Sequence, residues 1–146
     1  YLRIIYRLLE EMVGTWMALI GSLLLFAGVH AFNEGETIIS IFMLMVSSLV
    51  LIAPFILTRQ IWLSWGFHAA WNFMQAGVFG MANSGIMFEG WIIPKITGPQ
   101  WVTGGTVGLE GTYLSVAIDF FIGLILLLLA VKTGKVTLPK WQRVST

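Results

Sequence analysis

The sequence predicts an all-α membrane protein, a polytopic bundle of about four transmembrane helices. Three observations predict this class. Apolar residues make up 58% of the 146 residues, and the mean hydropathy is +0.88. A soluble domain of this length could not bury so many apolar side chains in one core. Only 15 residues are charged, 8 basic and 7 acidic, and they fall between long apolar runs.

The same composition excludes several functions. A net charge of +1 without a basic cluster argues against nucleic-acid binding. The absence of Cys excludes disulfides, thiolate metal sites and a Cys nucleophile. The amount of apolar surface excludes a disordered chain. The first partner to expect is therefore the lipid bilayer.

The whole chain, residues 1–146, is interpreted as a single membrane domain. Residues 1–13 have apolar side chains at helical spacing and are predicted to form an amphipathic interface segment that Gly14 ends. The predicted spans cover residues 15–32, 37–58, 61–80 and 112–131. Turns at 33–36 and 59–60 join the first three. Residues 81–110 form a Gly- and Pro-rich loop, too broken to span and able to dip into the interface, and 132–146 form a polar tail.

The distribution of Lys and Arg supports the count of four spans. Seven of the eight basic residues then lie on one side: Arg3, Arg7, Arg59, Lys132, Lys135, Lys140 and Arg143. The other side has Lys95 together with Glu34, Glu36, Glu89 and Glu110. Because basic residues favour the cytoplasmic side, both termini are predicted to be cytoplasmic.

A few polar residues fall inside the predicted spans, where each costs a few kcal/mol. His68 and Asn72 are four residues apart and share one helix face. Together they could ligate a metal, donate hydrogen bonds to an oxyanion, or join two helices. His30, near the end of the first span, is open to a structural or a functional interpretation. Asp119 in the last span could partner His30 or His68, but we favour a structural role for it.

The acidic pair Glu10–Glu11 has a simpler interpretation than a catalytic one. Glu11 is four residues after Arg7, the spacing of a surface ion pair on a helix. Neither Glu10 nor Glu11 is therefore expected to act beside the two His residues.

Two short motifs on separate spans resemble those of a known family. Phe26 and His30, in FAGVH, match a Phe-x-x-x-His motif, and His68 and Asn72, in HAAWNF, match a His-x-x-x-Asn motif. The ordered pair resembles the CPBP family of intramembrane proteases, also called type II CAAX proteases or the Abi family. The segments QAGVFGMANSG and GPQWVTGGTVGLEG resemble a bacterial subgroup, which implies the bacterial plasma membrane.

The resemblance implies a membrane metalloendopeptidase that hydrolyses a peptide or prenylated peptide. In the family, a first-motif Glu and the His matched by His30 activate water, and the residues matched by His68 and Asn72 polarise the scissile carbonyl or help to hold a metal. Zinc stays open as a cofactor, with His30 and His68 as its ligands. Phe26 is a supporting residue.

One motif of the family is missing. The first motif is Glu-Glu-x-x-x-Arg, but Thr15 stands where the Arg would follow Glu10–Glu11, and Glu10 is only 20 residues before His30. The chain, which starts without Met, is therefore expected to be the C-terminal part of such a protease and to be inactive alone. Counting along ideal helices places His30 about 22 Å and His68 about 12 Å from the cytoplasmic face, so a shared site needs a tilted first span or one that begins outside the bilayer.

Two hypotheses from other classes remain. His30 and His68 could be the two axial ligands of a haem or bind a metal in an electron-transfer subunit, although Asn72 has no role there. The chain could also be a non-catalytic scaffold or transporter subunit, because broken helices and Gly-rich re-entrant loops occur in transporters.

Overall fold

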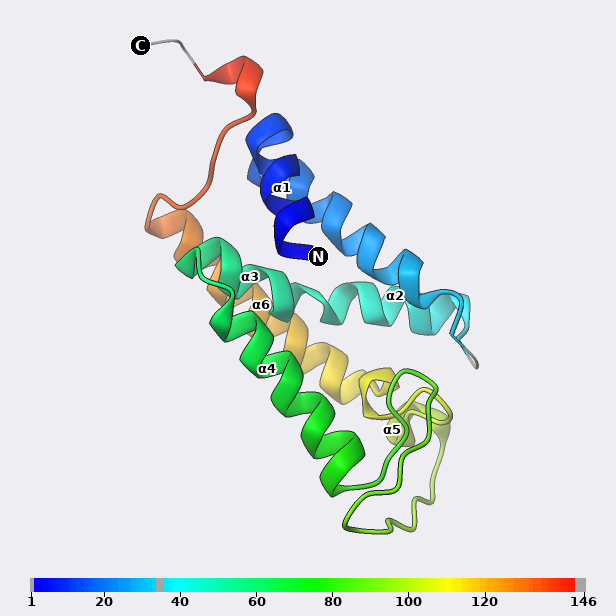
Figure 1. Cartoon of the computed structure of the whole chain (residues 1–146). Helices are drawn as coiled ribbons and strands as arrows, with labels where there is room; N and C mark the ends of the chain where they lie inside the picture. Colours follow the sequence, from blue (N-terminus) through cyan, green and yellow to red (C-terminus); the bar gives the residue numbers. More distant parts are fainter. Residues whose placement is uncertain (1, 34–35, 144–146) are drawn as a thin grey trace.

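The computed structural model describes residues 2–33 and 36–143, and these are mostly helical (Figure 1). The main helices are α1 (Leu2–His30), α2 (Ile38–Ser47), α3 (Leu49–Thr58), α4 (Trp62–Asn72), α5 (Gln100–Thr103) and α6 (Tyr113–Lys132). A π-helix at Phe73–Val78 continues α4, and 3-10 turns lie at Leu109–Gly111 and Lys140–Gln142. The described part contains isolated bridges but no strand, so the predicted all-α membrane bundle is confirmed. Glu34 of the predicted turn and the side chain of Arg3 lie outside the described residues.

Within the described ranges, three helices are long and apolar enough to cross a membrane: Ile4–His30, Ile38–Thr58 and Tyr113–Lys132. They correspond to the first, second and fourth predicted spans. The third predicted span is built differently, as α4 followed directly by the π-helix. The count of four spans therefore stays a prediction.

Helix α1 is kinked at Gly14, where the tail of the chain crosses it. Gly14 has φ 80° and ψ 170°, outside the helical region. A Cβ at this position would lie 2.8 Å from the backbone nitrogen of Pro139 and 2.9 Å from the oxygen of Thr137. The backbone nitrogen of Thr15 donates to that same oxygen at 3.0 Å. Glycine is needed here for both the positive φ and the close approach.

The second span bends between α2 and α3. Thr37 and Ser40 cap the start of α2 with a capping box. Ser48 separates the two helices, and its hydroxyl donates to the oxygen of Met45 at 2.7 Å. Pro54 lies inside α3, where it removes one backbone donor. Arg59 ends α3 in the left-handed conformation and turns the chain into α4.

The core lies where α3 and α6 cross, with α1 packed alongside. Its buried residues are Tyr6, Ala18, Leu19, Leu49, Ile52, Ala53, Phe55, Ile56, Leu127 and Ala130. Helix α6 turns Ser115, Asp119, Gly123, Leu127 and Ala130 inward, at the spacing of one helix face. Large apolar side chains such as Phe32, Trp62 and Leu128 stay exposed, as expected for a surface that faces lipid.

Candidate active site

His30 is the last residue of α1, and the preceding turn of that helix orients its ring. Its Nδ1 lies 2.8 Å from the backbone oxygen of Phe26, and the two rings are 4.4 Å apart between centroids. A carbonyl oxygen only accepts a hydrogen bond, so Nδ1 carries the proton. In the neutral ring Nε2 then keeps its lone pair. The four-residue spacing of Phe26 and His30 thus leaves one basic nitrogen available.

His68 and Asn72 lie one turn apart on α4. The Asn72 Nδ2 is 3.3 Å from the Nε2 of His68. Asn72 is half-buried, whereas the His68 side chain is more open. The α-helix ends at Asn72 and the π-helix begins with the next residue. π-Helical turns are frequent at functional sites, which adds a second signal to the polar pair.

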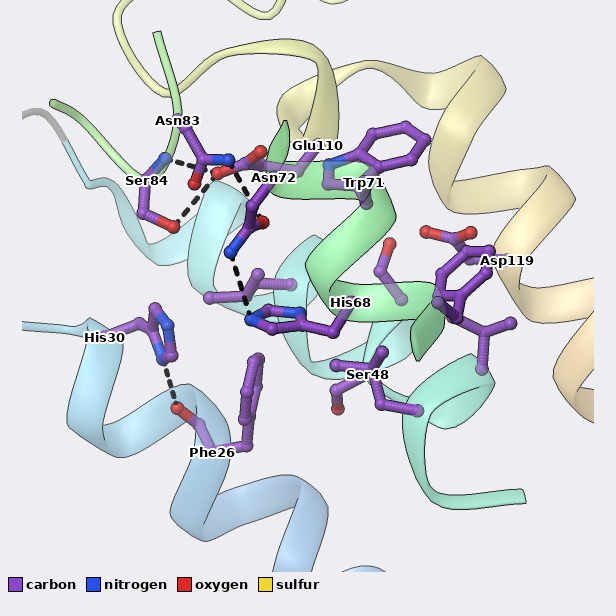
Figure 2. A pocket seen from close by; sticks show the side chains of 15 residues that line it. Phe26, His30, Ser48, His68, Trp71, Asn72, Asn83, Ser84, Glu110 and Asp119 are labelled. Atoms are coloured by element: carbon purple, nitrogen blue, oxygen red, sulfur yellow. Dashed lines mark hydrogen bonds between the residues drawn. The ribbon is translucent and has the colours of Figure 1, made fainter. Parts of the chain in front are cut away.

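A single pocket is lined by all four predicted site residues, Phe26, His30, His68 and Asn72 (Figure 2). Its volume of about 50 Å³ is room for a few water molecules. The two imidazoles therefore come together from different helices despite their unequal helical counts.

Sequence reasoning missed three polar residues of this pocket, Asn83, Ser84 and Glu110, which come from the loop between the π-helix and α6. Glu110 accepts hydrogen bonds from the Ser84 hydroxyl at 3.0 Å, from the Ser84 backbone nitrogen, and from Gln75 Nε2 at 2.8 Å. Asn83 donates from Nδ2 to Asn72 Oδ1 at 3.1 Å. No spacing rule places such loop residues, so the sequence carried no signal for them beyond their polarity.

Asp119 also lines the pocket, from the buried face of α6, with 8% of its surface exposed. Together with Glu110 it supplies two carboxylates at the pocket, whereas the sequence interpretation favoured a structural role for Asp119 and did not single out Glu110. The reason is tertiary: Glu110 reaches the pocket through the path of the loop, and Asp119 through the packing of α6.

The pair Glu10–Glu11 lies away from this pocket. Glu11 forms the predicted exposed ion pair with Arg7 at 3.3 Å. Glu10 is buried and accepts hydrogen bonds from Tyr6 at 3.0 Å, from Thr15 at 2.6 Å and from Arg59. These hydrogen bonds occupy its carboxylate at the end of the bundle where Arg7, Arg59 and Arg143 gather, which we call the basic end. The Glu10 carboxylate therefore cannot act beside His30.

The predicted zinc site can be checked against the side chains present. Among residues 2–33 and 36–143, no three His, Asp or Glu side chains gather in a way that could hold a metal ion. A zinc site of three protein ligands is therefore not built from the described residues. The two imidazoles alone do not fit it.

A second, larger cavity of about 320 Å³ meets the first. Both are lined by Phe26, Leu51 and His68. The rest of the larger cavity is mostly apolar: Tyr6, Ile52, Phe55, Ile61 and Trp65, with two serines, Ser22 and Ser64. Both serine hydroxyls are buried without a hydrogen-bond partner. This apolar groove thus leads from the basic end of the bundle to His68.

The structure is thus a helix bundle of membrane-spanning character in which two imidazoles and a carboxamide line one small pocket. The family model of the type II CAAX prenyl endopeptidases, Rce1-like, matches residues 1–74, half of the chain, and the chain belongs to this family. The match includes Phe26, His30, His68 and Asn72 and ends before Asn83 and Glu110. Among curated proteins and among solved structures, none matches.

Proposed function

We propose that this chain contributes His30, His68 and Asn72 to the active site of a CAAX-type intramembrane endopeptidase. The observation that supports this most is the convergence of His30, His68 and Asn72 on one small pocket. Family membership supplies the reaction class, hydrolysis of a peptide bond at the membrane. The apolar groove, which shares His68 with the pocket, suits the lipid part or the extended backbone of a prenylated peptide.

In the proposed reaction His30 acts as a base through Nε2. It takes a proton from a water molecule in the pocket, and the resulting hydroxide adds to the scissile carbonyl carbon. The Asn72 amide, which His68 holds through Nε2, donates a hydrogen bond to the oxyanion that forms. The proton then passes from His30 to the leaving amine as the C–N bond breaks, so that water is consumed and two peptides are released.

We further propose that these residues need the carboxylate of the family's first motif for full activity. Glu10 cannot supply it, because Tyr6, Thr15 and Arg59 occupy its oxygens. Glu110 is likewise engaged by Ser84 and Gln75. The chain alone is therefore expected to hydrolyse peptides very slowly.

The test compares this chain with the same chain extended by a helix that carries Glu-Glu-x-x-x-Arg, each reconstituted in lipid vesicles. The substrate is a farnesylated peptide, and mass spectrometry detects the released C-terminal fragment. We expect release by the extended chain and its loss in H30A and H68A. A folded extended chain that releases no fragment, or H30A and H68A variants as fast as their parent, would overturn the proposal.

A haem between His30 and His68 is a competing hypothesis from another class. The pocket volume of about 50 Å³ favours water over a macrocycle. A Soret band in the purified protein, lost in H30A and H68A, would favour the haem. If H30A and H68A both leave the cellular function of the protein unchanged, the hypothesis of a non-catalytic scaffold is favoured.

A further inference from the structure

The Asn72 amide stands between two partners that use its opposite ends. Its Oδ1 accepts from Asn83 Nδ2 at 3.1 Å, and its Nδ2 lies 3.3 Å from His68 Nε2 (Figure 2). The oxygen of a carboxamide only accepts and its nitrogen only donates. Once Asn83 takes the oxygen, only the NH₂ group is left to face His68.

This arrangement fixes which ring nitrogen of His68 carries a proton. An NH₂ group can pair with His68 Nε2 only if that nitrogen keeps its lone pair, so the proton of the neutral ring is on Nδ1. If the Asn72 amide were turned over, its oxygen would face His68 and require a proton on Nε2. The state of His68 therefore depends on what residue 83 offers to Asn72.

We propose that Asn83 is a positioning residue that sets the tautomer of His68 through Asn72. Within the described part of the chain, Asn83 forms no hydrogen bond with His30 or His68, and it lies outside the part that the family model matches. The inference concerns the pocket of the proposed function but does not depend on peptidase activity, because its readout is spectroscopic.

The loop backbone holds Asn83 in place. The backbone nitrogen of Asn83 donates to the oxygen of Ile86 at 2.9 Å, and the oxygen of Asn83 accepts from the nitrogen of Ile86 at 3.0 Å. Asn83 also forms a bridge to Gly108. A Cβ at Gly108 would lie 2.0 Å from the oxygen of Ala82, so only glycine allows this approach. The tight crossing fixes where the Asn83 side chain starts.

Glu110 joins this loop to the helix that carries His68. It binds Ser84, the neighbour of Asn83, through the hydroxyl at 3.0 Å and through the backbone nitrogen. Its other oxygen accepts from Gln75 at 2.8 Å, and Gln75 lies in the π-helix that continues α4. These hydrogen bonds of Glu110 to Ser84 and Gln75, which we call the Glu110 clamp, keep Asn83 within reach of Asn72. The amide of Asn72 then selects the tautomer of His68.

The experiment is ¹⁵N NMR of the imidazole nitrogens in detergent at about pH 8, above the ordinary His pKa. The chain has only two His residues, so the variant H30Q assigns both sets of signals. In the unaltered chain we expect His68 Nε2 to be the nitrogen without a proton. In N83D the carboxylate only accepts, so Asn72 turns its NH₂ group toward residue 83, and His68 changes to the tautomer with a proton on Nε2.

Two further variants keep the result interpretable. N83A removes the hydrogen-bond donor to Asn72 without replacing it by an acceptor, so we expect both His68 tautomers to become populated. Q100E makes the same amide-to-carboxylate change in the same loop, outside the pocket lining, and should leave His68 unchanged. The signals of His30, anchored on Phe26, report that the fold is intact. A protonated Nε2 in the unaltered chain, or an identical His68 spectrum in a folded N83D, would overturn the proposal.

Discussion

Glu10 and Arg59, 49 residues apart in the chain, form an ion pair at the basic end of the bundle. The Glu10 side chain is only 6% exposed, and Arg59 is 34% exposed. Arg59 also donates to the backbone oxygen of Lys135, so one guanidinium ties α1, the α3–α4 turn and the tail together. Arg59 and Lys135, which the charge pattern assigned to one side of the membrane, thus belong to one contact.

Replacing Glu10 by Gln should destabilise the fold. The variant keeps the shape but removes the charge that accepts hydrogen bonds from Tyr6, Thr15 and Arg59. Leaving donors unpaired at a buried site costs about 1–3 kcal/mol. Thermal unfolding in detergent measures the change.

The matched control is E11Q, because Glu11 pairs with Arg7 on the surface, with side chains 60% and 64% exposed. An exposed pair contributes about 0.5 kcal/mol. Equal losses of stability in E10Q and E11Q would contradict the buried role of Glu10.

Gly123 should not tolerate a larger side chain. A Cβ there would meet the Leu49 side chain at 2.7 Å and its backbone carbon at 3.0 Å, where α6 crosses α3. Overpacking of this kind costs about 1–3 kcal/mol, so G123A should lower the unfolding temperature. G66A is the control, because a Cβ at Gly66 meets no atom within 4 Å. A G123A protein as stable as G66A would show that the helices do not approach so closely.

Removing the charge of Glu110 should loosen the loop at 81–110. In E110Q the amide end of the new side chain cannot accept from Ser84 or Gln75, and each lost bond to a charged group is worth about 1.5–3 kcal/mol. Lys95 is the only Lys or Arg between Arg59 and Lys132, so trypsin reports on this loop. We expect cleavage after Lys95 to be roughly tenfold faster. E89Q, an exposed change in the same loop, should cleave at the original rate, and a shared increase would refute the clamp.

Filling the apolar groove should affect substrate binding more than chemistry. Ser22 is fully buried, its hydroxyl has no partner, and it lines the cavity of about 320 Å³. In the extended chain, S22L should raise KM for a farnesylated peptide several-fold and leave kcat nearly unchanged, because the groove binds substrate and transition state alike. L24F, at an exposed position of the same helix, is the control. A fall in kcat with an unchanged KM would show that the groove does not bind the substrate.

The sequence predicted those features that depend on local pattern. Long apolar runs predicted the helical membrane bundle, and four-residue spacings paired Phe26 with His30 and His68 with Asn72. It could not predict the contributions of Asn83 and Glu110, because these depend on how an irregular loop folds back on α4. The burial of Glu10 was missed for the same reason: its partner Arg59 is distant in the chain.

The central claim is that His30 and His68 line one site. The chain has no Cys, so the double variant H30C/H68C can be treated with a short bismaleimide in membranes and analysed by mass spectrometry. We expect an intramolecular cross-link between positions 30 and 68, and little or none for H30C/W62C, in which the second Cys lies near the other end of α4. A cross-link in H30C/W62C but not in H30C/H68C would contradict the shared site and the peptidase proposal that depends on it.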